Sequence, residues 1–411
     1  MVRSEIPASS KDYTPSTGQE RRDFPSLFQP AAEPPTELGR YRILAPNAGI
    51  RVSPLCLGAM SLGDQWTGFM GNAMNYEESA KFLDYYYEAG GNFIDTANAY
   101  QDEQSEMIIG EWMEKRGNRD EMVIATKYTT YNMDRKDSRI NGIGANYVGN
   151  SKKTLHLNID DSLKKLRTTY IDILYVHWWD YSTSIPEVMQ SLNDLVRERK
   201  VLYLGISDTP AWIVSEANCY ARQHGLAQFV VYQGSWNLCK RDMERDIIPM
   251  CRANGMSIAP YAVLGQGRFK TPEENEQRRK DGKFRAGMEP SENEIKISKA
   301  LKEVADEIGG ETKLTSVALA WARQTVAYCF PIVGGTSIEY LKANIEALKI
   351  QLTSEQLEKL NNAVQFDWGF PYLGFGRDPH YLPDGIPNSA LLNAVGPFMR
   401  TKLASPRSGV E

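Results

Sequence analysis

The chain has 411 residues, of which 42% are hydrophobic and 24% charged, with 32 Gly and 21 Pro. This composition is ordinary for globular proteins and excludes a disordered chain, a collagen or a coiled coil, while the length suits one large α/β barrel with extensions or two domains. The formal net charge is −5, which excludes a global positive field that attracts nucleic acid or anionic membranes. We therefore expect a small molecule or another protein as the partner.

The five cysteines are scattered and form no C-x-x-C motif, which favours free thiols in a reducing compartment. The four histidines form neither an H-x-x-x-H motif nor a cluster with cysteines, so no metal site is predicted. The N-terminal segment lacks the apolar stretch of a signal peptide, and no window has the apolar length of a membrane helix. These features predict a cytoplasmic protein with no membrane partner.

The first part of the chain differs in composition from the rest. Residues 1–38 are rich in Pro, Ser, Glu and Arg without periodicity, which predicts a flexible N-terminal extension. Two short apolar segments, 41–44 and 50–53, then flank the turn sequence Pro46-Asn-Ala-Gly. They predict a small hairpin ahead of the main fold, acting as a plug or a lid.

From Leu55 onward, short apolar segments alternate with amphipathic helical patterns. The strand candidates are 54–57, 92–95, 122–125, 171–176, 203–206, 229–232, 257–260 and 329–332. The helix candidates are 77–90, 104–116, 151–167, 185–199, 210–223, 241–254, 293–309 with 313–324, and 338–348. Eight strands that alternate with helical connections predict an α/β protein with a (β/α)8 TIM barrel, over residues 39–365.

Two connections and the tail are longer than a minimal barrel needs. The connections 127–150 and 261–292 follow the third and seventh strands, on the face where barrels carry their active sites, so both are lid or cofactor-clamp candidates. The densely charged stretch 271–286 favours a solvated loop or helix. A last helix pattern covers 354–364. The C-terminal tail, 366–411, has six aromatic residues spread over its first part, 366–381. We expect the first half of that tail to fold over the barrel mouth.

Side chains able to transfer a proton follow three adjacent predicted strands. Asp95 ends the second strand and Tyr100 follows it, while Lys127 and His177 end the third and fourth. In a barrel these strand ends meet on one rim. A nearby ammonium lowers the pKa of a phenol, so Lys127, held by Asp95, is suited to activate Tyr100. His177 can donate to a developing alkoxide while a nicotinamide supplies hydride, so the set fits carbonyl reduction.

Several segments are similar to those of a known family. FIDTANAY (93–100), IATKY (124–128) and LYVHWWD (174–180) resemble the tetrad segments of the aldo-keto reductase superfamily. GISDTPAW (205–212), YQGSWN (232–237) and MSIAPYAVLGQGR (256–268) resemble its fungal aryl-alcohol dehydrogenase and norsolorinic acid reductase branch. The resemblance spans about residues 40–350. It implies that Tyr100 is the general acid/base, supported by Asp95, Lys127 and His177, with NADPH/NADP+ as cofactor.

The same resemblance implies a set of cofactor contacts. Ser207 and Gln233 would hold the nicotinamide carboxamide, with Tyr261 stacked on the ring and Asp208 beside Ser207, where many members carry Asn or Arg. The other implied contacts are Ala59 and Met60 near the nicotinamide, Leu264 and Gly265 along the pyrophosphate, and Gly334, Thr336, Tyr340 and Asn344 at the adenosine phosphate. Tyr340 and Ala343 depart from the usual residues there, and Arg268 and Lys270 are the nearest cationic candidates for the phosphates.

Aromatic residues after the strand ends are either ordinary packing or the walls of a substrate pocket. The candidates for substrate contact are Trp66, Tyr128 and Trp178, with Trp66 and Trp178 favoured. Together these features lead us to expect reversible NADPH-dependent reduction of aldehydes or ketones to alcohols, with aromatic and polyketide-derived carbonyls as the expected substrates. The alternative is a nucleotide-binding regulatory subunit with little turnover, like the potassium-channel β subunits of the same superfamily. A barrel lyase or hydrolase would need a metal site or paired carboxylates, and the sequence offers neither.

Overall fold

The computed structural model describes residues 30–70, 74–131, 143–280 and 289–381, together with positions 389, 391 and 394. Its main feature is an eight-stranded parallel sheet in the order β10-β3-β4-β5-β6-β7-β8-β9. A parallel bridge between Ile258 and Cys329 joins the two ends, so the sheet closes. The strands are β3 (Cys56–Gly58), β4 (Phe93–Asp95), β5 (Val123–Tyr128), β6 (Ile171–Val176), β7 (Val201–Ser207), β8 (Phe229–Ser235), β9 (Ser257–Tyr261) and β10 (Ile332–Gly334). The predicted (β/α)8 barrel is confirmed.

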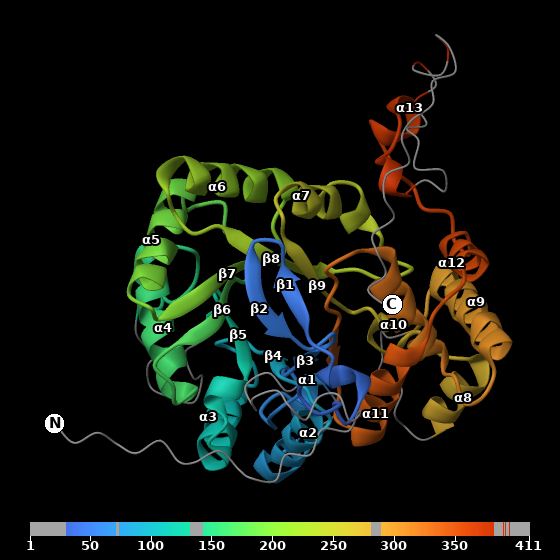
Figure 1. The fold of residues 1–411 in the computed structure, drawn as a ribbon, viewed down its shortest axis with the longest axis horizontal. Helices are drawn as coiled ribbons and strands as arrows, with labels where there is room; N and C mark the ends of the chain where they lie inside the picture. The colour runs from blue at the N-terminus through green and yellow to red at the C-terminus, as the bar shows by residue number, and fades with distance from the viewer. Residues whose placement is uncertain are drawn as a thin grey trace, which may run out of the picture.

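A ring of helices surrounds the sheet (Figure 1). Those of the ring are α2 (Tyr76–Glu88), α3 (Gln104–Arg116), α4 (Lys152–Lys165), α5 (Ile185–Arg197), α6 (Ala211–His224), α7 (Ile247–Ala253), α9 (Glu292–Ile308), α10 (Leu314–Thr325) and α11 (Ile338–Glu346). The helices α1 (Thr67–Met70), α8 (Pro272–Lys280), α12 (Ser354–Asn361) and α13 (Tyr372–Phe375) lie outside this set. The local sequence explains where several helices begin, because α2, α9 and α12 each begin with a reciprocal capping box.

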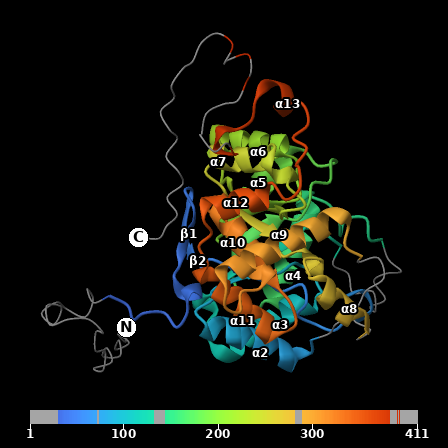
Figure 2. The ribbon, with the colours of Figure 1, turned by 90° about the vertical axis from the view of Figure 1, so that its right-hand side faces the viewer.

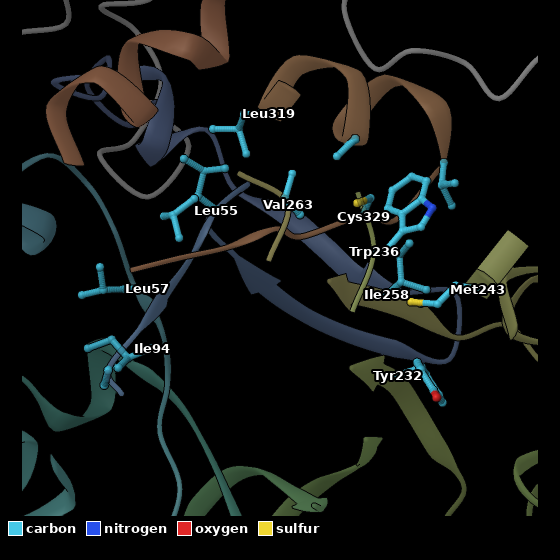
Figure 3. Close-up of a cluster of buried hydrophobic side chains, with 14 of the residues drawn as sticks. Leu55, Leu57, Ile94, Tyr232, Trp236, Met243, Ile258, Val263, Leu319 and Cys329 are labelled. Atoms are coloured by element: carbon cyan, nitrogen blue, oxygen red, sulfur yellow. The ribbon is translucent and has the colours of Figure 1, made fainter. Parts of the chain in front are cut away.

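Side chains along each barrel strand alternate between two apolar layers, as the pleat of a strand requires. The outer layer joins the strands to the helices; Figure 3 shows part of it, with Ile94, Tyr232 and Ile258 from the sheet and Leu319 from α10. The inner layer fills the barrel and includes Phe93. Fully burying one such side chain stabilises the fold by roughly 1.5–3 kcal/mol.

The hairpin of β1 (Arg42–Ala45) and β2 (Ala48–Val52) closes one end of the barrel. Its buried Leu44 and Val52 belong to the same apolar cluster as Phe93, at the start of β4. The hairpin lies across the barrel in Figure 1, and Figure 2 shows it at the opposite end from α8. Of the two predicted roles, the structure shows the plug, at the amino ends of the strands, and not the lid.

Residues 36–38, the end of the predicted extension, are attached to the barrel. Leu38 is fully buried, and Thr36 caps a short 3-10 helix (Glu37–Gly39) while its hydroxyl donates to the carbonyl of Ala89 at 2.7 Å. The prediction of a flexible extension to residue 38 was therefore wrong at its end, because one apolar side chain and one capping hydroxyl attach this segment to the barrel. Residues 1–29 lie outside the described part of the chain.

The described part of the tail lies against α7 on the outside of the ring. Arg245 donates to the carbonyl of Trp368 at 3.1 Å, Tyr372 bonds Asp246, and Arg252 pairs with Asp378 at 2.6 Å. Both ribbon views show α13 beside the ring and not across the barrel end (Figures 1 and 2). Hydrogen bonds to Arg245 and Asp246, just before α7, and one ion pair with Arg252 of α7 thus hold this segment beside the ring and not over the mouth, where its aromatic residues lead us to expect it.

The two long connections are described only in part. The charged stretch after β9 contains the helix α8, exposed or half-buried throughout, in agreement with the expected solvated loop or helix. Residues 132–142 and 281–288 of the lid candidates lie outside the described residues. No helix in the described parts of the chain is long and apolar enough to cross a membrane.

Candidate active site

The carboxyl ends of six neighbouring strands direct polar or aromatic side chains into the barrel mouth. Each lies two residues after an inward-facing position of the same strand, so the pleat that buries Phe93 and Ala125 also aims Asp95 and Lys127 inward. The members of this rim are Asp95 (β4), Lys127 (β5), His177 (after β6), Ser207 (β7), Gln233 (β8) and Tyr261 (β9). Asp95, Lys127 and His177 of the predicted tetrad thus share one rim with Ser207, Gln233 and Tyr261, and Tyr100, in the loop after β4, joins this rim through Lys127.

Lys127 is at the centre of the rim and its ammonium uses all three of its protons. Its Nζ lies 2.6 Å from Asp95 Oδ2, 2.7 Å from the carbonyl oxygen of Thr96 and 3.3 Å from Tyr100 Oη. The lysine side chain is fully buried, and burial opposes its charge, but Asp95 and Tyr100 together raise its pKa. Gln233 Nε2 donates to the second Asp95 oxygen at 2.8 Å. The ammonium is therefore fixed, charged and adjacent to the phenol.

Burial dominates the acidity of Tyr100. It raises the pKa of the phenol more than the Lys127 ammonium lowers it, and the Asp95 carboxylate adds to the rise. The expectation of a net lowering was therefore wrong. The phenol is protonated at neutral pH, with the ammonium placed to stabilise the phenolate that forms when the proton leaves.

The segment after Tyr100 positions one wall of the mouth. Gln101, Asp102 and Glu103 have consecutive positive φ angles of 54°, 49° and 79°, a strained run for residues other than glycine. Gln101 Oε1 accepts from the Trp66 amide at 2.8 Å, and Asp102 Oδ1 accepts from Trp66 Nε1 at 2.9 Å. The Trp66 and Tyr100 rings meet edge to face at 6.1 Å between centroids. The strained turn thus places Trp66 against the candidate acid.

His177 is a neutral imidazole in this setting. Burial first, and then the Lys127 charge, lowers its pKa to about 3. Its ring meets that of Tyr100 edge to face at 6.1 Å, and its Nδ1 lies 3.0 Å from Thr130 Oγ1. At neutral pH His177 therefore offers a hydrogen bond without adding charge to the rim.

The rim has the groups that a nicotinamide carboxamide needs. Ser207 is buried, and its hydroxyl has no hydrogen-bond partner among the residues that the structure describes. An unsatisfied buried hydroxyl is costly, and a carboxamide both donates and accepts. Gln233 lies on the next strand, where it already bonds Asp95, and Tyr261 follows on β9 with its hydroxyl donating to Asp208 at 3.1 Å. This arrangement fits the cofactor that the resemblance implies.

A second polar group lies where three segments meet beyond β9. Lys270 Nζ is 5.8 Å from the centre of the Tyr340 ring on α11, and Lys313 Nζ, just before α10, is 5.9 Å from it. Arg268, whose Nε lies 3.7 Å from Glu294, is in the same connection as Lys270. Tyr340 is well exposed, and its ring and the two lysines form a basic patch suited to a phosphate, although Glu274, 3.4 Å from Lys270 Nζ, offsets part of the charge.

The remaining predicted cofactor residues lie in the loops of the same face or on α11. Leu264 and Gly265 belong to the turn after β9, where a Cβ on Gly265 would approach the Phe269 ring to 2.7 Å. Ser61, in the loop of Ala59 and Met60, donates to Gly335 at 2.9 Å and so joins the loops after β3 and β10. Gly334 ends β10 and Thr336 follows it, whereas Asn344 is a buried residue of α11.

Tyr128, one of the predicted substrate contacts, does not face the barrel mouth. It follows Lys127 on β5, so the pleat turns it outward, where it is 1% exposed and packs in the layer between sheet and helices. The prediction of a substrate contact was therefore wrong for this residue. Trp66 and Trp178 are half-buried at the mouth, and Trp178 Nε1 donates to Thr130 Oγ1 at 3.0 Å.

Sequence reasoning did not single out three groups of residues that organise the site. They are Thr130, which contacts His177 and Trp178; Gln101 and Asp102, which hold Trp66; and Lys313, at the basic patch around Tyr340. Thr130 had a usable signal, because it is three residues after Lys127 at a strand end. Lys313 had none, since it comes from a helix start far along the chain. In the described parts of the chain no cluster of three or more His, Cys, Asp or Glu is placed to hold a metal ion.

Comparison with known proteins agrees with this geometry. The aldo/keto reductase family model matches residues 54–365. The chain is 54% identical over 364 residues to an aryl-alcohol dehydrogenase [NADP(+)] of Phanerodontia chrysosporium, covering 87% of this chain and 94% of that protein. It is 53% identical over 332 residues to norsolorinic acid reductase B of Dothistroma septosporum, covering 81% and 83%. The barrel, its rim of Asp95, Tyr100, Lys127 and His177, and these matches show that the chain belongs to the aldo/keto reductase family.

Proposed function

We propose that the protein reduces aldehydes or ketones, aromatic ones in particular, to alcohols with NADPH, and catalyses the reverse oxidation with NADP+. The observation that carries this proposal is the contact between a protonated phenol and a buried ammonium, Tyr100 Oη to Lys127 Nζ at 3.3 Å. The two relatives named for aryl-alcohol and norsolorinic acid chemistry support an aromatic substrate. Trp66 and Trp178 at the mouth give flat apolar walls that suit such a substrate.

The chain's own residues provide the proton transfer and the charge stabilisation. NADPH, when bound, supplies the hydride to the carbonyl carbon. Tyr100 transfers its proton to the carbonyl oxygen as negative charge develops there, and Lys127 stabilises the phenolate left behind. Asp95 holds Lys127 in place, and Gln233 in turn holds Asp95. His177 remains neutral and directs the carbonyl oxygen by a hydrogen bond.

The cofactor assignment follows from two separate features. Ser207, Gln233 and Tyr261 would hold and cover the nicotinamide, with Ala59 and Met60 on its other side. Lys270 and Lys313, with Arg268 nearby, would bind the 2′-phosphate that distinguishes NADPH from NADH, and Tyr340 lies between the two lysines. This places the phosphate partly on Lys313, a residue that the sequence analysis did not assign.

The test is removal of the Tyr100 hydroxyl alone. Tyr100→Phe should lower kcat for aromatic aldehydes by roughly two to four orders of magnitude, the contribution of a positioned general acid. Fold and NADPH affinity should persist, because Lys127 keeps its bonds to Asp95 and Thr96. The assay is cofactor oxidation followed by absorbance, with nicotinamide fluorescence for affinity. Near-normal kcat in Tyr100→Phe would refute the role of Tyr100, and tight NADPH binding by a wild-type protein that reduces no carbonyl would favour a regulatory subunit.

A further inference from the structure

Two adjacent threonines after β5 hold both the main chain and the side chain of His177. Thr129 Oγ1 accepts from the His177 amide at 3.3 Å, and Thr130 Oγ1 lies 3.0 Å from the ring nitrogen Nδ1. Thr129 has a φ of 95°, an unfavourable angle for a β-branched residue. The Thr130 carbonyl accepts from Asn98 Nδ2 at 2.7 Å. Thr130 is thus held between β5, which carries Lys127, and the segment that carries Tyr100.

The proton positions follow from the chemistry of the three partners. Trp178 Nε1 can only donate, so Thr130 Oγ1 accepts its proton at 3.0 Å. The Thr130 hydroxyl has one proton of its own to donate. Within the described parts of the chain, the acceptor that the structure offers it is His177 Nδ1. A neutral imidazole has one protonated nitrogen, so when Nδ1 accepts, Nε2 holds the proton.

We propose that Thr130 is a positioning residue that fixes His177 as the Nε2–H tautomer, with Trp178 as the donor that orients the threonine. The proposal rests on the proposed carbonyl reduction for its catalytic meaning. With Nε2 protonated, the ring nitrogen not bonded to Thr130 donates a hydrogen bond and helps to align the carbonyl oxygen beside Tyr100. The other tautomer would direct a lone pair from Nε2 and repel that oxygen.

The tautomer also decides which of the two candidate donors, Tyr100 or His177, gives up its proton. An imidazole that keeps its Nε2 proton cannot accept the Tyr100 proton, so Tyr100 remains the group that is deprotonated during reduction. Lys127 is bonded to Tyr100 and lies near its ring, at 4.9 Å from Nζ to the ring centre. The fixed cation therefore favours proton loss from the phenol, while Thr130 keeps the imidazole as a donor.

The experiment observes the tautomer directly. The chain has four histidines, so protein labelled with nitrogen-15 histidine gives a small set of ring signals, and His177→Asn identifies that of His177. Nitrogens with and without a proton resonate far apart. We expect the wild type to show Nε2–H for His177. Thr130→Val, similar in shape but without the hydroxyl, should shift His177 toward a mixture of tautomers, and Thr130→Ser should restore Nε2–H.

Kinetics gives the second readout. In Thr130→Val we expect kcat to fall about tenfold, the loss of one hydrogen bond in the transition state, with NADPH affinity unchanged and recovery in Thr130→Ser. An Nδ1–H signal in the wild type, or unchanged Nε2–H and unchanged kcat in Thr130→Val, would overturn the proposal. If the wild type reduces no carbonyl but shows the Nε2–H signal and its loss in Thr130→Val, the tautomer assignment stands and the proposed function fails.

Discussion

The neutrality of His177 predicts a pH dependence of stability that one substitution removes. Its pKa is about 3 in the folded protein against an ordinary 6.5, so between these values the unfolded chain binds a proton that the folded protein does not. Stability is then full above pH 6.5 and falls as the pH decreases toward 3. Between pH 7.5 and pH 5 this one group should cost at most about 2 kcal/mol.

The measurement is urea unfolding of wild type and His177→Asn at several pH values from 7.5 to 5. The variant should lose less stability than the wild type over this range, by up to about 2 kcal/mol, whatever its stability at pH 7.5. His156→Asn, at an exposed histidine of α4, controls for the loss of an imidazole from the surface. Parallel curves for wild type and His177→Asn would show that His177 is not held neutral. A steeper loss in the variant would mean that His177 is protonated when folded, contradicting the proposed donor role.

Two further substitutions test the rest of the site. Lys127→Met should reduce kcat about as strongly as Tyr100→Phe. It should also lower the free energy of unfolding by roughly 3–5 kcal/mol, because it leaves the buried Asp95 carboxylate without its cation. Adding Asp95→Asn to the Lys127→Met variant should recover part of that free energy, measured by urea unfolding. Lys270→Ala should weaken NADPH binding about tenfold and leave NADH binding unchanged in a fluorescence titration, since it removes one charge from the proposed phosphate site. The control is Lys200→Ala, before β7 at the opposite end of the barrel, which should leave the affinities for NADPH and NADH unchanged. If Lys270→Ala weakened the binding of NADPH and NADH equally, the 2′-phosphate would lie elsewhere.

The barrel was predictable because its signals are local and repeated. Each apolar segment is short, bounded by a helical pattern and rich in β-formers, and β6 matches its predicted bounds, 171–176, in full. The rim was predictable for a related reason, since strand ends in a barrel share one face. Tyr128 shows where that rule is too coarse. A residue at a strand end faces the mouth only if it lies on the inward side of the pleat, and Tyr128 follows the inward Lys127 by one position.

The failures at the tail and at Tyr100 have a different origin. Composition shows that a segment is rich in aromatic residues, but not which surface it packs against. Here the contacts with Arg245, Asp246 and Arg252 hold the segment against the outside of the ring, and Phe370 and Phe375 stay exposed. The acidity of Tyr100 depends on a balance between burial and a cation, and a sequence shows the cation without the burial. Both outcomes depend on surroundings formed by distant segments.

The charges around Lys127 support the proposal that Tyr100, and not His177, is the proton donor. Asp95 and Lys127 form a buried pair with no net charge, and Tyr100 and His177 are both neutral at pH 7. Protonating His177 would place a second cation near Lys127, and the structure opposes this, because burial first and then the Lys127 charge lower the imidazole pKa. Deprotonating Tyr100 places an anion beside the same ammonium and is favoured by it. The fixed Lys127 ammonium therefore opposes charge on the imidazole, and it favours the phenolate against the burial that opposes it, which supports the proposal that the proton for the alcohol comes from Tyr100.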